Sequence, residues 1–310
     1  MIPDLSVELC GVRLANPLVL ASGILGTEAA LMERVVRCGA GAVTAKSCGP
    51  EPRPGHRNPT VLHWGPGLIN AVGLANPGVD EAIPLLQETA VRLKPFGTPL
   101  IASIFARSAD EFGYMAARVA EAHPDLIEIN LSCPNITAEM GRPFALDPAA
   151  TAAATRAAVN ATDIPILVKL SPNVTDLVAI AQAAVEAGGR GLTLINSLGP
   201  GMVIDIESGA PILSNRVGGV SGPAIRPIAV RCVYDVTRAL NVPVIGVGGV
   251  MDGRDAIEMV MAGATAVGIG SAVYWHGPEV FARICREMSD FMSAHHHRSL
   301  DEIRGIAHDR

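Results

Sequence analysis

Two lysines stand where a reactive site would need a fixed positive charge. The chain has 24 basic residues, and only Lys46, Lys94 and Lys169 among them are lysines. Lys46 and Lys169 lie near the ends of short apolar runs, 42–47 and 166–171, that are typical of buried strands. An ammonium group there can stabilise negative charge on a bound ligand. The alternative is that each side chain simply reaches water. Lys94 closes a predicted surface helix and has no assigned role.

Carboxamide side chains form the next set of chemically useful groups. A primary amide donates and accepts hydrogen bonds at once, so several converging amides suit a planar ring edged with N–H and C=O groups, such as a pyrimidinedione or a flavin. Each asparagine alone is typical of a turn or a helix cap. The candidates, with one adjacent serine, are Asn70, Asn76, Asn130, Asn135, Asn196 and Ser197.

Cys133 is the one thiol in a position that indicates chemistry. It lies between Ser132 and Pro134, just after a predicted strand, where it can act as a nucleophile, a general base or an inert filler. The chain has six cysteines and no C-x-x-C pair, so we expect no zinc site and no iron–sulfur cluster on it.

Glycines follow the last two predicted strands. Gly248-Gly249 and Gly270-Ser271 would let backbone N–H groups approach an anion, which predicts a phosphate site there. The alternative is that these glycines only permit tight turns.

The elements that must position these residues alternate in type along the chain. Eight βα units predict a (β/α)8 TIM barrel, whose site lies at the carboxyl ends of its strands. An open doubly wound sheet is the competitor, but no G-x-G-x-x-G follows the first strand. The predicted strands are 18–23, 42–47, 100–105, 126–132, 166–171, 192–197, 244–249 and 266–272. The predicted helices lie near 27–38, 80–94, 108–122, 147–161, 175–188, 224–240, 252–263 and 277–292.

Three segments fall outside the βα period. Residues 7–14 alternate around Gly11 and predict a hairpin that closes the bottom of the barrel. We expect two long loops on the C-terminal face, formed by residues 48–79 and 198–223. The second loop contains a strand-like segment at 203–206. We expect one domain over 1–310.

Composition excludes several classes of protein. A net charge of −6 gives no basic surface for nucleic acid, and no apolar run is long enough for a bilayer. The start of the chain lacks the basic region of a signal peptide, so we expect a cytoplasmic protein.

Several motifs together resemble the class 1 dihydroorotate dehydrogenases. They are Asn130-Leu-Ser-Cys133-Pro-Asn135, Asn70-Ala-Val-Gly73-Leu-Ala-Asn76-Pro, Val168-Lys169-Leu-Ser-Pro and Gly218-Gly219-Val-Ser-Gly222-Pro-Ala-Ile. The resemblance runs from about residue 5 to the C-terminus. It implies an FMN-dependent barrel that oxidises (S)-dihydroorotate to orotate in de novo pyrimidine (UMP) biosynthesis.

The resemblance also implies residue roles. Cys133 would be the base that takes the C5 proton while hydride leaves C6 for flavin N5, and Lys46 would touch flavin and substrate. The implied substrate contacts are Lys46, Asn70, Ala71, Val72, Gly73, Leu74, Asn130, Asn196 and Ser197. The implied FMN contacts are Ser22, Lys46, Ser47, Ser103, Asn130, Lys169, Ile195, Gly222, Gly248, Gly249, Gly270 and Ser271. The segment 134–144, with Gly141, would be a lid.

The subtype follows from finer features of the resemblance. Cysteine as the base argues against class 2, and 201–207 followed by the glycine motif resembles class 1B. Class 1B implies a homodimer and a heterotetramer with a subunit carrying FAD and a [2Fe–2S] cluster, which passes electrons to NAD. Two positions depart from that pattern: Ser103 replaces a usual Asn and is closer to the fumarate-using class 1A, and Ser197 replaces a usual Thr.

Three alternatives stay open at this point. A related flavin dehydrogenase of dihydropyrimidines without the carboxylate would share the thiol and the amides. A Schiff-base aldolase would use Lys46 or Lys169 on a sugar phosphate and be colourless. A non-catalytic barrel subunit would hold no cofactor.

Overall fold

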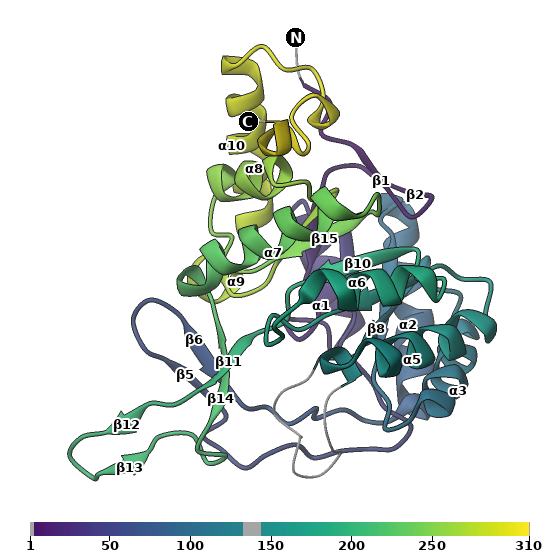
Figure 1. Cartoon of the computed structure of the whole chain (residues 1–310), viewed down its shortest axis with the longest axis vertical. Helices are drawn as coiled ribbons and strands as arrows, with labels where there is room; N and C mark the ends of the chain where they lie inside the picture. The colour runs from purple at the N-terminus through teal and green to yellow at the C-terminus, as the bar shows by residue number, and fades with distance from the viewer. Residues whose placement is uncertain (1–2, 133–143, 310) are drawn as a thin grey trace.

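A closed barrel of eight parallel strands forms the centre of the molecule. The computed structural model describes residues 3–132 and 144–309. Each strand pairs in parallel with its neighbours around the ring, and apolar side chains fill the barrel and the space under its helices (Figure 1). In ring order the strands are β3 (Leu18–Leu20), β4 (Ala42–Thr44), β7 (Leu100–Ile104), β8 (Leu126–Asn130), β9 (Ile166–Lys169), β10 (Gly191–Leu194), β15 (Val244–Val247) and β16 (Ala266–Ile269).

Helices cover the outside of the ring, which confirms the predicted (β/α)8 architecture. Each buries one apolar stripe against the strands, as Met32 and Val35 do in α1. The helices are α1 (Ala29–Arg37), α2 (Val79–Leu93), α3 (Ala109–Ala120), α5 (Pro148–Asn160), α6 (Leu177–Glu186), α7 (Arg226–Ala239), α8 (Gly253–Met261), α9 (Ala272–His276) and α10 (Val280–Ala294). Short 3₁₀ turns are η1 (Lys94–Phe96), η3 (Phe144–Leu146), η4 (Pro223–Ile225), η5 (Leu300–Glu302) and η6 (Ile306–Asp309).

The barrel strands are shorter than predicted at their carboxyl ends. Strand β4 ends at Thr44, two residues before Lys46, and β3 ends at Leu20, two before Ser22. The residues that follow the last strand–strand hydrogen bond are also buried or half-buried and keep the apolar pattern. A prediction from that pattern alone therefore makes the strand too long. Asn130 and Lys169, in contrast, are the last residues of β8 and β9.

The predicted N-terminal hairpin is confirmed. It consists of β1 (Val7–Leu9) and β2 (Val12–Leu14), paired antiparallel, and Leu9 and Leu14 are fully buried. The Cys10 Sγ donates to the carbonyl oxygen of Arg190 at 3.2 Å, directly before β10. The hairpin therefore closes the N-terminal end of the barrel, opposite the carboxyl ends of the strands.

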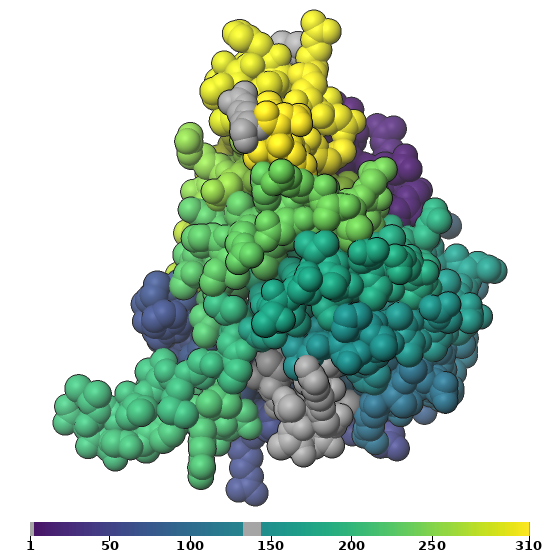
Figure 2. All heavy atoms as spheres, in the orientation of Figure 1, coloured from purple at the N-terminus to yellow at the C-terminus, as the bar shows by residue number. Residues whose placement is uncertain are grey.

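The two long connections are not structureless, contrary to expectation. They form one four-stranded antiparallel sheet in the order β11 (Leu198–Gly201), β14 (Gly218–Ser221), β6 (Leu68–Asn70) and β5 (Val61–His63), here called the cap sheet. A smaller pair, β12 (Ile204–Asp205) and β13 (Ala210–Pro211), extends from it within the predicted strand-like segment. This arm projects from the body of the molecule (Figures 1 and 2).

Within 3–132 and 144–309, no helix is both long and apolar enough to cross a membrane. The same residues contain no group of three or more His, Cys, Asp or Glu side chains placed to hold a metal ion.

Candidate active site

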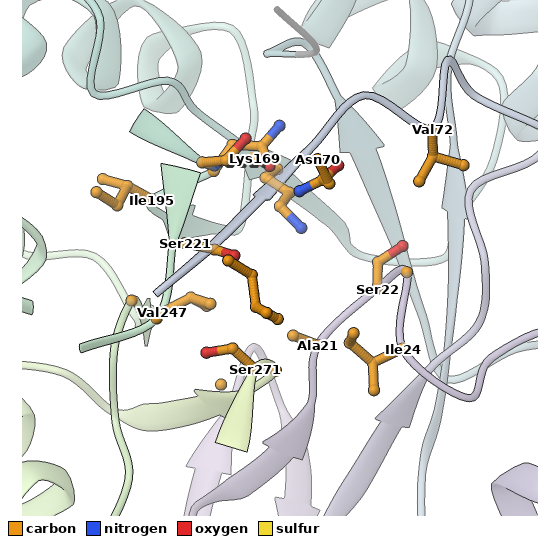
Figure 3. Close-up of a pocket in the computed structure, with 18 of the residues that line it drawn as sticks. Ala21, Ser22, Ile24, Asn70, Val72, Lys169, Ile195, Ser221, Val247 and Ser271 are labelled. Carbon is orange, nitrogen blue, oxygen red and sulfur yellow. Dashed lines mark hydrogen bonds between the residues drawn. The ribbon is translucent and has the colours of Figure 1, made fainter. Parts of the chain in front are cut away.

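A pocket opens at the carboxyl ends of the barrel strands, under the cap sheet. Its empty space, counted out to the mouth and including the open solvent there, is about 1320 Å³. Figure 3 shows side chains from strands on both sides of the barrel arranged around it. The predicted site residues that line it are Ser22, Lys46, Ser47, Asn70, Val72, Gly73, Leu74, Asn130, Lys169, Ile195, Asn196, Ser197, Gly222, Gly248, Gly249, Gly270 and Ser271.

Three predicted site residues do not appear in that lining. Ala71 is fully buried, with Ile69 and Leu213, beneath the cap sheet. Ser103 is 1% exposed and bonds to other side chains inside the barrel. Cys133 lies outside the described residues, as do Asn135 and all of the predicted lid over 134–144 except Phe144.

The cap sheet forms one wall of the pocket, and the sequence did not predict it. It contributes Val61, Leu68 and Ser221 besides the expected Asn70. The amide of Asn70 donates to the carbonyl oxygen of Gly219 on the neighbouring strand at 3.4 Å, which holds its side chain at the sheet. The sheet thus couples the two long connections to the mouth of the barrel.

Ser132 joins two of the carboxamides. Its hydroxyl donates to Asn130 Oδ1 at 3.1 Å and accepts from Asn196 Nδ2 at 2.9 Å. Asn196 Oδ1 also accepts from the backbone N–H of Ser197 at 3.0 Å. Two side chains from β8 and the end of β10 are therefore fixed relative to one another at the pocket.

Asn76, a candidate carboxamide, has a structural role. It is 9% exposed, accepts from the backbone of Gly49 and Gly78, and donates to the carbonyl oxygen of Leu74 at 2.9 Å. Leu74 has a φ of 56°, in the left-handed region, so this bond stabilises the turn that brings 72–74 to the pocket.

Lys169 lies at the floor of the pocket. Its side chain is 7% exposed, and its Nζ is 3.6 Å from Oε1 of Glu128, which is 2% exposed. Sequence reasoning missed Glu128, although a single acidic residue inside the apolar run 126–130 was a usable signal. Lys46 lines the same pocket from beyond β4.

Glycines form the edge of the pocket near β15 and β16. A Cβ on Gly249 would be 2.7 Å from the carbonyl oxygen of Gly222, so two loops meet there more closely than side chains allow. A Cβ on Gly270 would meet only Ala21, at 3.7 Å, so its backbone faces open space. This edge, with the Ser271 hydroxyl, can receive an anionic group.

The five described thiols are poor nucleophiles. Burial raises the pKa of Cys48 to about 12 and the pKa values of Cys10, Cys232 and Cys285 to about 11. Burial also raises the pKa of Cys38. None of these five lines the pocket.

The sequence is similar to proteins named as dihydroorotate dehydrogenases. Residues 4–292 match the family model described as dihydroorotate dehydrogenase. The chain is 50% identical to the "Dihydroorotate dehydrogenase B (NAD(+)), catalytic subunit" of Methanothermobacter thermautotrophicus over 308 residues, which covers 98% of this chain and 99% of that protein. Proteins of the same name from Methanocaldococcus jannaschii and Geobacter sp. are 43% and 40% identical, each over 98% of both chains.

Proposed function

This chain belongs to the dihydroorotate dehydrogenase family, and we propose that it oxidises (S)-dihydroorotate to orotate with bound FMN, in de novo pyrimidine (UMP) biosynthesis. One observation carries the proposal. The predicted FMN and substrate residues lie at or just after the carboxyl ends of all eight barrel strands and in two long connections, yet almost all of them line one pocket.

The residues of the pocket fit FMN. Ile24, Ile195 and Val247 offer apolar contacts for a planar ring, and Figure 3 shows them around the same space as Lys169. The open backbone at Gly270, with Ser271, suits a phosphate. When bound, FMN supplies the acceptor for the C6 hydride at its N5.

The chain's own groups bind the substrate and move its proton. Asn130 and Asn196, locked together by Ser132, and Asn70 on the cap sheet bind the N–H and C=O edge of the dihydropyrimidine ring. Cys133, three residues after Asn130, takes the C5 proton. Lys46 binds substrate and cofactor, and Lys169 stabilises negative charge at the floor of the pocket.

The electrons leave through a second subunit. The relatives are named as NAD-linked catalytic subunits, and a catalytic subunit implies a partner. The proposed assembly is a homodimer of this single-domain chain, 1–310, joined in a cytoplasmic heterotetramer by a subunit that carries FAD and [2Fe–2S] and delivers electrons to NAD.

Anaerobic titration tests the function. The purified protein should be yellow, and dihydroorotate should bleach it, whereas dihydrouracil, which lacks the carboxylate, should not. A colourless preparation that FMN cannot reconstitute would refute the proposal. Bleaching by dihydrouracil alone would assign the chain to the related dihydropyrimidine dehydrogenases.

A further inference from the structure

Glu128 is a buried acid that the proposed reaction does not use. It lies in the middle of β8 between Ile127 and Ile129, and only 2% of its surface is exposed. A buried carboxylate is costly unless charges and hydrogen bonds compensate for the lost water. Its neighbours on the adjoining strands should therefore show what this residue is for.

Each carboxylate oxygen of Glu128 has its own partner on a different strand. Oε1 accepts from the Ser103 hydroxyl on β7 at 3.1 Å and faces Lys169 Nζ on β9 at 3.6 Å. Oε2 accepts from the Thr193 hydroxyl on β10 at 2.9 Å. The carboxylate is thus held from three strands, and among the described residues the cation paired with it is the Lys169 ammonium.

The hydrogen bonds continue from Ser103 to the other side of the pocket. The Ser103 hydroxyl lies 2.8 Å from that of Ser47, and the Ser47 hydroxyl lies 3.1 Å from that of Ser22. Ser22 and Ser47 both line the pocket. A chain of three hydroxyl groups thereby connects the pocket wall beside β3 and β4 to the Glu128 carboxylate. Ser103 is the last hydroxyl of this chain before the carboxylate and lies below the pocket, not in its lining.

We propose that Glu128 is a positioning residue: it fixes the Lys169 ammonium at the floor of the pocket and keeps it charged whether or not an anion is bound above it. The inference deepens the proposed flavin function and rests on it. Both side chains are withdrawn from water, so the two charges depend on each other. Without Glu128, the Lys169 ammonium would lose the carboxylate that faces it at 3.6 Å.

The first test needs no flavin. With only three lysines in the chain, ¹⁵Nζ-lysine NMR of the flavin-free protein can follow the titration of each one, and exposed Lys94 serves as internal reference. In Glu128→Gln, which keeps the shape but removes the charge, the Lys169 signal should titrate at a pH lower by one unit or more, about a tenfold change in proton affinity. An unchanged titration would overturn the inference even if the flavin function holds.

Two further variants control for loss of structure. Thr193→Val removes one hydrogen bond from the carboxylate but keeps the ion pair, so Lys169 should titrate as in the parent. A shift as large as that of Glu128→Gln would mean that any change around the carboxylate moves the titration, and it would refute the positioning role of Glu128. If Glu128→Gln does not fold, Lys169→Gln supplies the reciprocal test. Removal of its cation should then shift the carboxylate stretching bands of Glu128 in infrared spectra, and unchanged bands would overturn the inference.

The second test uses the holoenzyme. In the parent, flavin reduction above neutral pH should take up about one proton for every two electrons. In Glu128→Gln, Lys169 should take up a second proton during reduction. The slope of the midpoint potential against pH should therefore about double. The double variant Glu128→Gln/Lys169→Gln should keep the slope of Lys169→Gln alone. A steeper slope in the double variant would show that Glu128 does not act through Lys169. If no flavin binds, the proposed function fails while the NMR result still decides the role of Glu128.

Discussion

Ser132 shows how one hydroxyl can organise a binding site without lining it. It is 1% exposed, yet it donates to Asn130 and accepts from Asn196, so the two carboxamides that line the pocket share one anchor. Because a hydroxyl both donates and accepts, no apolar residue of the same size can replace it.

Ser132→Ala should weaken orotate binding more than it lowers the rate of proton transfer. Both carboxamides lose a buried partner, at a cost of about 1–3 kcal/mol to stability. Orotate titration followed by the flavin spectrum, with thermal unfolding in parallel, measures both effects. Ser171→Ala is the matched control, because its buried hydroxyl accepts only from the backbone of Asn173 among the hydrogen bonds described for it. Equal loss of orotate affinity in both variants would contradict the prediction.

Lys169→Arg should slow flavin reduction by dihydroorotate about tenfold or more. The guanidinium is wider than the ammonium, and there is little room for it at a site 7% exposed and 3.6 Å from Glu128. Anaerobic stopped-flow measures the rate. Lys94→Arg makes the same change on the exposed surface and should leave the rate unchanged. Normal reduction in Lys169→Arg would remove the argument for a compact cation.

Alkylation should distinguish Cys133 from the other thiols. Burial raises the pKa of all five described cysteines, to about 11 for Cys10, Cys232 and Cys285 and to about 12 for Cys48, so they carry little thiolate at neutral pH. Iodoacetamide at neutral pH should therefore label Cys133 first, and orotate should protect it. Peptide mass spectrometry reads out each site. Equal labelling of all six would count against Cys133 as the base.

At the scale of elements, the turn after β15 and the turn after β16 make different demands on their glycines. Gly248 has a φ of 144°, and a Cβ there would lie 2.5 Å from the Cβ of Ala229 in α7. Gly270 has no such constraint, because its nearest neighbour would be 3.7 Å away. Gly248 is therefore required by the packing of the fold, whereas a side chain at Gly270 would conflict only with a ligand that approaches its backbone.

Gly248→Ala should therefore destabilise the protein by about 1–3 kcal/mol and lose flavin as a consequence. Gly270→Ala should keep its thermal stability but bind FMN more weakly, since its methyl group points into the pocket. Unfolding midpoints of the flavin-free proteins and FMN titrations separate the two effects. A Gly270→Ala variant that is less stable but binds FMN normally would contradict the assignment of Gly270 to cofactor binding.

The barrel could be predicted because each βα unit carries its own pattern. The continuous apolar run of 100–104 and the amphipathic stripe of α1 are local signals, and both elements formed where expected. The cap sheet could not, because its strands have three or four residues and its central pairing joins positions about 150 residues apart, as with Asn70 and Gly219. The residues taken from the motif resemblance line one pocket, except Ala71 and Ser103, which are buried, and Cys133, which lies outside the described residues; their roles stay predictions.

At the scale of the whole molecule, the proposed assembly separates the oxidation of dihydroorotate, on this chain, from the reduction of NAD, on its partner subunit. The chain alone should be bleached by dihydroorotate but should reduce NAD at a negligible rate. Adding the FAD and [2Fe–2S] subunit should restore NAD reduction, whereas fumarate should not support turnover. Steady-state assays with each acceptor, with and without the co-purified partner, measure this. Rapid fumarate reduction by the chain alone would place it with the class 1A enzymes.

The barrel also keeps its two chain ends on one side. The backbone of Asp4 bonds to Arg298 at 2.8 Å and bridges to Ser299, beside the hairpin that closes the barrel, and the pocket opens at the other end (Figure 1). A tether at either end would therefore attach the protein to a support with the pocket facing the solution. Immobilised on an electrode or a bead in this way, the molecule would present its cap sheet and mouth to substrate in one uniform orientation.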